Sequence, residues 1–287
     1  MLIDVEHLTR YTYSAPVTLD RQLVRLKPRS DAYQQLKRFE LKLQPASARS
    51  WEETDAEGNA VMHVQVHEPV TLFEVVSRAL VETRAPAPLP DEAPAAALRF
   101  PLHYPADTPP AVLAYAGPVT TDPAVNRFAA EVADGARWEV LPFLALLAAR
   151  IQRTHAYQLR YEGPPRPAAA TLERREGACR DFAVLYIDAC RAFGVASRFV
   201  SGYRLRDPDG VGRELHAWVE AYVPGVGWRG FDPTSGRPVA DDHVAIAAGT
   251  PATAAPVTGT FWGSGVSSQL LATVEARRAQ PEMLGAA

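Results

Sequence analysis

Hydrophobic and polar residues alternate over short stretches within the first 84 residues of the chain. Alternation with a period of two is typical of strands that bury one face, and polar or Pro/Gly turns separate the stretches. We expect strands at Leu2–Thr12, Gln22–Lys27, Phe39–Leu43, Val61–Val66 and Leu72–Val81. Several short strands joined in this way predict an antiparallel β-sandwich domain over residues 1–84.

The pattern changes after this domain. Residues 85–110 are rich in Pro and Ala and are expected to form a linker. Helices are then expected at 123–133, with Asp122 as N-cap, and at 141–154, where apolar residues recur with the helical period. Residues 155–161 alternate like a strand. We expect the second domain, a core of helices packed on an antiparallel sheet, to span residues 111–277, so the fold class is α+β.

A third helix is expected to carry a cysteine at its N-terminus. From Asp181 to Phe193 apolar residues follow the i, i+3, i+4, i+7 spacing, and extending this stripe backwards reaches Cys179. Free amides and the positive dipole end of a helix stabilise a thiolate, which is the nucleophilic form of cysteine. Thr171 is expected to cap the short turn at 172–175 that precedes this helix, and Asp181 to favour the helix dipole.

An imidazole and a carboxylate follow on a predicted hairpin. Residues 215–223 alternate like a strand, and residues 228–231 begin a second strand after a Pro/Gly turn. His216 opens the first strand and Asp232 closes the second, so the hairpin can bring the two side chains together. Cys179, His216 and Asp232 are the set of groups that a papain-like acyl-transfer site needs.

Each of these residues also has a purely structural interpretation. A lone helical cysteine is usually a small buried hydrophobic residue, as we expect for Cys190, and a lone strand histidine is usually hydrogen-bonded in the core. Cys179, His216 and Asp232 nevertheless favour an acyl-transfer site, because each lies at the end of an element and these elements can pack together. His63 and His67 share a strand face, where a solvated surface is favoured over metal binding. We expect no metal and no cofactor.

These motifs resemble those of the bacterial transglutaminase-like proteins of the papain-like superfamily. The nucleophile, histidine and aspartate motifs of that family are similar to Gly177-Ala-Cys-Arg-Asp-Phe-Ala183, Leu215-His-Ala-Trp-Val-Glu220 and Gly230-Phe-Asp-Pro-Thr234. Residues 1–84 resemble the β-rich domain that often precedes this core. The resemblance implies that Cys179 is the nucleophile, His216 the base and Asp232 the orienting carboxylate. Arg180 departs from well-studied transglutaminases, which commonly have Trp after the nucleophile.

Composition narrows the classes of function and location. The 287 residues are 47% hydrophobic and 22% charged, which is typical of a soluble protein of about two domains. The net charge of −3 is mixed along the chain, so we expect no nucleic-acid or membrane partner. The first residues lack a basic n-region, so no signal peptide is expected. Cys179 and Cys190 would lie about 16 Å apart along one helix, too far for a disulfide, and free thiols favour a cytoplasmic location.

Residues 242–262 lack a clear period and are expected to form a loop, residues 269–277 a last strand, and residues 278–287 a disordered tail. Two classes of function remain open. The first is a thiol enzyme that forms a thioester on Cys179 from a protein or peptide amide, resolved by an amine or, as we favour, by water. The backbone amide of Cys179 is one expected oxyanion donor, and Tyr157, Tyr161 and Trp218 are candidates for a second. The alternative is a silent fold that acts as a scaffold, with a protein partner on the N-terminal domain.

Overall fold

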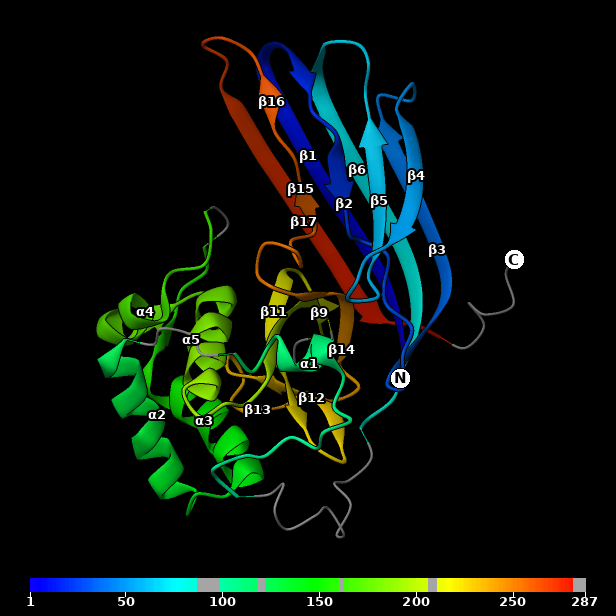
Figure 1. Cartoon of the computed structure of the whole chain (residues 1–287). Coiled ribbons are helices and arrows are strands. Elements are labelled where there is room, and N and C mark those ends of the chain that lie inside the picture. The colour runs from blue at the N-terminus through cyan, green and yellow to red at the C-terminus, as the bar shows by residue number, and fades with distance from the viewer. Residues whose placement is uncertain (87–98, 118–121, 161–162, 206–210, 281–287) are drawn as a thin grey trace.

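A computed structural model describes residues 1–86, 99–117, 122–160, 163–205 and 211–280. Its sheets are antiparallel apart from one short two-stranded pair, and its helices lie between residues 110 and 191 (Figure 1). The expected α+β class is therefore confirmed. Residues 87–98 of the linker expected at 85–110 and residues 281–287 of the expected tail lie outside the described residues.

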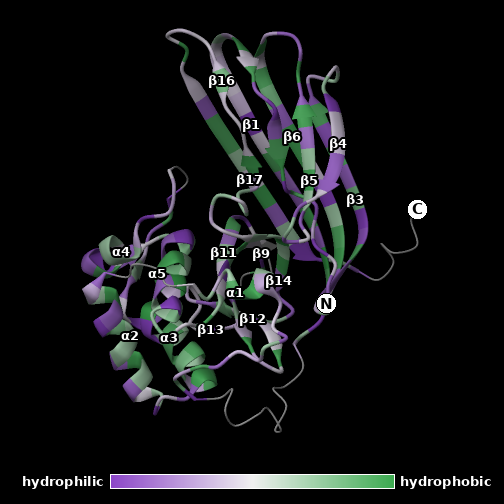
Figure 2. Cartoon of the chain, viewed as in Figure 1, coloured by the Kyte–Doolittle hydropathy of each residue, from purple (hydrophilic) through white to green (hydrophobic). Residues whose placement is uncertain are grey.

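The first 84 residues fold into a sandwich of two sheets. They form β1 (Leu2–Leu19), β2 (Gln22–Val24), β3 (Gln34–Gln44), β4 (Arg49–Thr54), β5 (Ala60–Gln65) and β6 (Val70–Thr83). β1, β3 and β6 lie in one sheet and β2, β4 and β5 in another, and residues such as Ile3 and Val64 belong to one apolar core. Hydrophobic positions, shown in green, recur along these strands in Figure 2. β4 was not predicted because all six of its residues are exposed, so it has no buried face to produce alternation.

The last strand returns to the N-terminal sheet. β17 (Ser268–Arg278) pairs with β1 from Ile3 opposite Arg278 to Tyr13 opposite Ser268. Three short strands, β10 (Val211–Gly212), β15 (Val257–Thr258) and β16 (Phe261–Trp262), also join the strands of the sandwich. The prediction that the core extends to residue 277 is thus wrong at this end, because local alternation does not reveal which sheet a strand will join.

The helices pack around the one that carries Cys179. They are α1 (Pro110–Leu113), α2 (Pro123–Gly135), α3 (Val140–Thr154), α4 (Ala168–Arg174) and α5 (Cys179–Arg191). Asp122 caps α2 as predicted, since its side chain accepts a hydrogen bond of 2.7 Å from the Ala124 amide. The predicted cap at Thr171 is wrong: α4 begins after Pro167, and the Thr171 hydroxyl donates back to the Pro167 carbonyl from within the helix.

The strand expected at 155–161 is shorter than predicted. β7 (Ala156–Tyr157) pairs in parallel with β8 (Glu176–Gly177), residues 158–160 form no strand, and Tyr161 lies outside the described residues. This short pair holds the end of α3 beside the start of α5.

A five-stranded sheet completes the core in the order β13, β12, β11, β9, β14. These strands are β9 (Ser197–Arg204), β11 (Leu215–Val223), β12 (Gly227–Asp232), β13 (Arg237–Pro238) and β14 (His243–Gly249). The predicted hairpin is present as β11 and β12. The loop predicted at 242–262 is wrong, because it contains β14. All seven residues of β14 are buried, and a strand buried on both faces shows a continuous apolar run instead of alternation.

Two amide side chains of the N-terminal domain complete the free edge of β14. The Gln34 side chain donates to the Ala245 carbonyl at 2.9 Å and accepts from the Ala245 amide at 2.7 Å. The Asn59 side chain does the same with the carbonyl and amide of Ala248, both at 2.8 Å. These side chains satisfy backbone groups that a further strand would otherwise pair. The two domains therefore share a hydrogen-bonded boundary.

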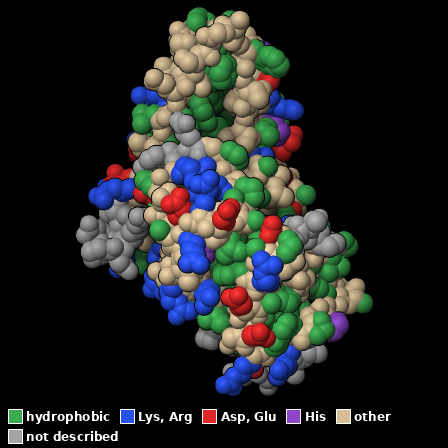
Figure 3. All heavy atoms as spheres, turned by 90° about the vertical axis from the view of Figure 1, so that its left-hand side faces the viewer, with side chains coloured by type: hydrophobic (Ala, Val, Ile, Leu, Met, Phe, Trp, Pro, Cys, Tyr) green, Lys and Arg blue, Asp and Glu red, His purple; other side chains and the backbone are tan. Residues whose placement is uncertain are grey.

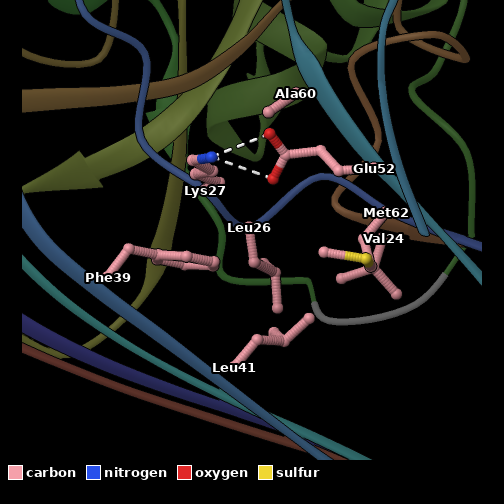
Figure 4. A pocket seen from close by; sticks show the side chains of 8 residues that line it. All are labelled: Val24, Leu26, Lys27, Phe39, Leu41, Glu52, Ala60 and Met62. Carbon is pink, nitrogen blue, oxygen red and sulfur yellow. Dashed lines mark hydrogen bonds and ion pairs between the residues drawn. The ribbon is translucent and has the colours of Figure 1, made fainter. Parts of the chain in front are cut away.

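Acidic and basic side chains are interspersed on the face shown in Figure 3. A cavity of about 10 Å³ inside the sandwich is lined by apolar side chains and by the ion pair of Lys27 with Glu52, 2.8 Å long (Figure 4). It has room for about one water molecule, so it is not a substrate site. None of the described helices combines the length and apolar character that crossing a bilayer requires.

Candidate active site

Cys179 is the first residue of α5 and its side chain is buried, with 8% exposed. Gly177 allows the preceding loop to approach the helix closely, because a Cβ at this position would lie 2.9 Å from Cβ of Asp181. The Asp181 carboxylate accepts a hydrogen bond of 2.9 Å from the Ala178 amide, which fixes the helix start. Cys179 therefore lies in the first turn of α5, beside free backbone amides and the positive end of the helix dipole.

Asp181 does more than favour the helix dipole, which is the role that the sequence predicted. Its side chain is fully buried, and Oδ1 accepts from the Arg166 amide at 2.8 Å and from Arg160 Nη2 at 2.6 Å. Asp181 thus joins Arg160 and Arg166 to the first turn of α5. Sequence spacing could not show these contacts, because they come from a Pro-rich loop without a period.

Replacing Asp181 by Asn should lower the free energy of unfolding by about 2–3 kcal/mol, because an amide cannot accept all the hydrogen bonds of the buried carboxylate. Asp188→Asn, a half-buried position on the same helix, is the matched control and should change stability much less. Urea unfolding of the two variants and the wild type checks this. Equal losses at the two positions would contradict the capping role.

His216 and Asp232 lie together on β11 and β12. His216 Nε2 is 3.1 Å from Asp232 Oδ2, an ion-pair distance that does not meet hydrogen-bond angles. His216 also makes a side-chain hydrogen bond with Cys179. Both the imidazole and the carboxylate are buried. The structure thus brings the three sequence-predicted residues into one contact chain.

The electrostatics of this pair favour charge on both partners. Burial disfavours the charged ring of His216, but the Asp232 carboxylate and Cys179 outweigh burial and raise the pKa of His216 to about 10. Burial likewise opposes ionisation of Asp232, but its contacts with His216 and His243 hold the pKa of this carboxyl well below its ordinary value. At neutral pH the ring is therefore an imidazolium and the carboxylate is ionised.

Three further residues surround the carboxylate and were missed by the sequence. Arg204 Nη1 lies 3.2 Å and His243 Nε2 3.5 Å from Asp232 Oδ2. Asp242 contacts both, with Oδ1 2.6 Å from His243 Nδ1 and Oδ2 3.6 Å from Arg204 Nε. Arg204 and His243 are cross-strand partners on β9 and β14. One sequence feature could have identified Asp242 and His243. They stand directly before a short apolar run, and such a run is typical of a buried strand.

The charges around Asp232 disfavour a metal ion at this site. Ligand atoms of His216, Asp232 and His243 lie within 4.8 Å of one another, a grouping that could hold a cation among the described residues. The Arg204 guanidinium already contacts the same carboxylate oxygen and would repel a cation. His63 is occupied elsewhere, with Nε2 3.1 Å from Glu53 Oε2 and its ring stacked on Trp51.

The candidate oxyanion donors are placed as follows. The Tyr157 hydroxyl donates to Glu214 at 3.3 Å, and Tyr161 lies outside the described residues. Trp218 is buried, with its ring 6.2 Å from that of His216 and 5.2 Å from that of His243. Arg180 is half-buried and donates to the Arg160 carbonyl at 2.6 Å, so it is not simply a solvated residue.

Cys190 fits its structural interpretation. Both cysteines are free, and Cys190 lies fully buried within α5. Burial raises the pKa of the Cys190 thiol to about 12, so it remains protonated at neutral pH. Cys190 is therefore an internal control for thiol chemistry at Cys179.

Comparisons with known proteins agree with the arrangement. Residues 3–82 match the bacterial transglutaminase-like N-terminal region, and residues 127–233 match the transglutaminase-like superfamily. An uncharacterized protein of Mycobacterium leprae is 29% identical over 271 residues, covering 92% of this chain and 94% of that protein. A protein-glutamine gamma-glutamyltransferase of Pseudomonas aeruginosa is 32% identical over 103 residues, 31% of this chain and 15% of that protein.

The crystal structure of a candidate cysteine protease from Cytophaga hutchinsonii has the same fold. It aligns with a TM-score of 0.72 and 21% identity, covering 98% of this chain and 91% of that one. The two family matches and this fold account for both domains described above. Residues 127–233 thus belong to the transglutaminase-like superfamily, and residues 3–82 before them to the bacterial transglutaminase-like N-terminal region.

Proposed function

We propose that this protein is a thiol enzyme that cleaves or transfers the acyl group of a protein or peptide amide through a thioester on Cys179. The observation that carries the proposal is the buried contact chain from Cys179 through His216 to Asp232. The thiolate is the form of cysteine that attacks an acyl carbon, and a helix start and a neighbouring imidazolium are the surroundings that stabilise a thiolate in thiol enzymes. The family match and the fold support a cysteine-enzyme scaffold of this type.

The reaction begins with attack of the Cys179 thiolate on the amide carbonyl carbon. His216 Nε2 faces Asp232, which leaves Nδ1 as the ring nitrogen for the thiol and the substrate. The negative oxygen of the tetrahedral intermediate is stabilised by the Cys179 backbone amide at the start of α5. The C–N bond then breaks, the leaving amine takes a proton from the His216 imidazolium, and a thioester remains.

The second half of the reaction decides between hydrolysis and transfer. His216, now neutral, removes a proton from water or from an incoming amine, which attacks the thioester and releases the Cys179 thiolate. Water gives an acid, whereas an amine gives a new amide. The name of the Pseudomonas aeruginosa relative supports transfer from a glutamine side chain over the shared 103 residues. We favour hydrolysis, and the assay below separates the two.

The test is mass spectrometry of glutamine-containing peptides incubated with the full chain, in isotopically labelled water, with and without a primary amine probe. Label in the peptide shows hydrolysis and amine adducts show transfer, and either product should disappear in Cys179→Ser. Cys190→Ala is the matched control and should retain activity. If peptides of varied sequence give neither product nor a trapped thioester, the scaffold hypothesis replaces the enzyme.

A further inference from the structure

One carboxylate, that of Asp232, contacts two imidazoles and one guanidinium. Besides His216, its Oδ2 lies near His243 Nε2 at 3.5 Å and Arg204 Nη1 at 3.2 Å. Its Oδ1 accepts from the Thr234 amide at 2.9 Å. The reaction proposed above uses His216 and assigns no role to His243.

Asp242 ties His243 to the carboxylate. Its two oxygens contact His243 Nδ1 at 2.6 Å and Arg204 Nε at 3.6 Å, and both partners reach Asp232. The four side chains therefore form a closed ring of charged and polar contacts. The Asp232 carboxylate cannot turn away from His216 without breaking a contact of this ring. A ring of this kind restricts the orientation of the acceptor more than a single contact would.

The Trp218 side chain packs against both imidazoles, whose own ring centroids lie 6.0 Å apart. Its ring lies 30° from the plane of His216 and meets the His243 ring nearly edge-on, at 76°. All three rings are buried, so neither imidazole has space to exchange places with the other. This arrangement keeps His216 toward Cys179 and His243 toward Asp242.

The N-terminal domain determines where His243 lies. His243 is the first residue of β14, whose edge is held by the Gln34 and Asn59 side chains. Just before it, the Asp241 carbonyl accepts from the Thr83 hydroxyl at 2.5 Å. His243 thus lies between anchors on both sides, and each anchor comes from the N-terminal domain.

We propose that His243 is a positioning residue that holds the Asp232 carboxylate against His216, and that the N-terminal domain fixes His243 by holding β14. This inference rests on the proposed function in one respect, which is that the Asp232–His216 pair takes part in catalysis. It gives the N-terminal domain a part in the active site itself.

The experiment is a histidine-selective NMR titration of His216 in the full chain, comparing wild type with His243→Phe, which keeps a ring but removes both nitrogens. The charged groups around His216 are Cys179 on α5 and Asp232 on β12, with Arg204 on β9 beside that carboxylate. The pKa of His216 should fall by about one unit or more in the variant, because the ion pair with Asp232 loosens. Alkylation of Cys179 should slow by about 10- to 100-fold.

An unchanged or higher pKa of His216 would overturn the proposal. If His243 only competed with His216 for Asp232, its removal would strengthen the His216–Asp232 pair and raise the pKa of His216. His243→Gln keeps a hydrogen-bond donor, so the pKa of His216 in this variant should stay close to the wild-type value. This variant can be measured even if His243→Phe does not fold. His7→Phe is the matched control, because His7 is a buried histidine that hydrogen-bonds Tyr203 and Thr9. It should leave the pKa of His216 unchanged.

Asn59→Ala tests the role of the N-terminal domain and should lower the pKa of His216 in the same direction but by less. No change in this variant would remove the domain from the proposal. If wild-type Cys179 is inert while His216 responds to His243→Phe, the proposed function fails and the positioning role stands. If Cys179 is reactive and the pKa of His216 does not respond to His243→Phe, the proposed function stands and the positioning role of His243 fails.

Discussion

Replacing His216 by Ala should slow the alkylation of Cys179 by iodoacetamide about 100-fold at pH 6.5. In the proposed mechanism the positive charge of His216 holds the attacking sulfur as a thiolate, and an alanine side chain cannot supply that charge. Because the pKa of His216 is raised to about 10, the wild-type rate should stay nearly flat from pH 6 to 9. The rate in the variant should rise with pH throughout this range.

Mass spectrometry of each cysteine after timed alkylation measures both rates in one experiment. Cys190 should remain unmodified in the folded wild type and variant, since it is fully buried and protonated up to about pH 12. His155→Ala removes another buried histidine, one whose ring lies 5.9 Å from that of Phe182 on α5, and is the matched control. A Cys179 that reacts as slowly as Cys190 in wild type, or equally fast without His216, would refute the enzyme hypothesis.

Replacing Asp232 by Asn should lower kcat by about four orders of magnitude, because the imidazole loses the group that orients it and stabilises its charge. The variant should also lose about 3–5 kcal/mol of stability, since the change leaves Arg204 and the imidazolium without their buried counter-charge. Turnover of the peptide amide and urea unfolding measure the two effects separately. The pKa of His216 should fall, because the carboxylate makes the larger contribution to raising it and only that of Cys179 would remain.

Asp242→Asn is the matched control for this change. Asp242 contacts Arg204 and His243 but is partly exposed, so its loss should cost less activity and less stability than that of Asp232. If Asp232→Asn retained most of the activity, the carboxylate would be a structural residue and His216 would need another orienting group.

Local patterns predicted the parts of this site that lie on regular, half-buried elements. The stripe on α5 placed Cys179 at a helix start, and alternation in β11 placed His216 at a strand start. The hairpin then brought Asp232 close without any long-range information. These three positions follow from periodicity and turn chemistry alone, which is why the sequence was sufficient.

The remainder depends on contacts between distant segments. β14 has no alternation because both of its faces are buried, so the sequence predicts that Asp242 and His243 lie in a loop. Arg204 is the last residue of β9, and its contact with the site depends on the pairing of β9 with β14. Asp181 was given a local role because its partners Arg160 and Arg166 lie in a loop without a period. Long-range pairing is the information that a local pattern lacks.

The pairing of β1 with β17 has a consequence for how the chain folds during synthesis. β1 leaves the ribosome well before β17, because more than 240 residues separate the two strands, so the N-terminal sheet stays incomplete until β17 has been made. The core strands β9, β11 and β12 can pair earlier, because they are close in sequence. Until β17 arrives, one edge of β1 is open to pairing with other chains, which makes nascent and truncated forms prone to aggregation.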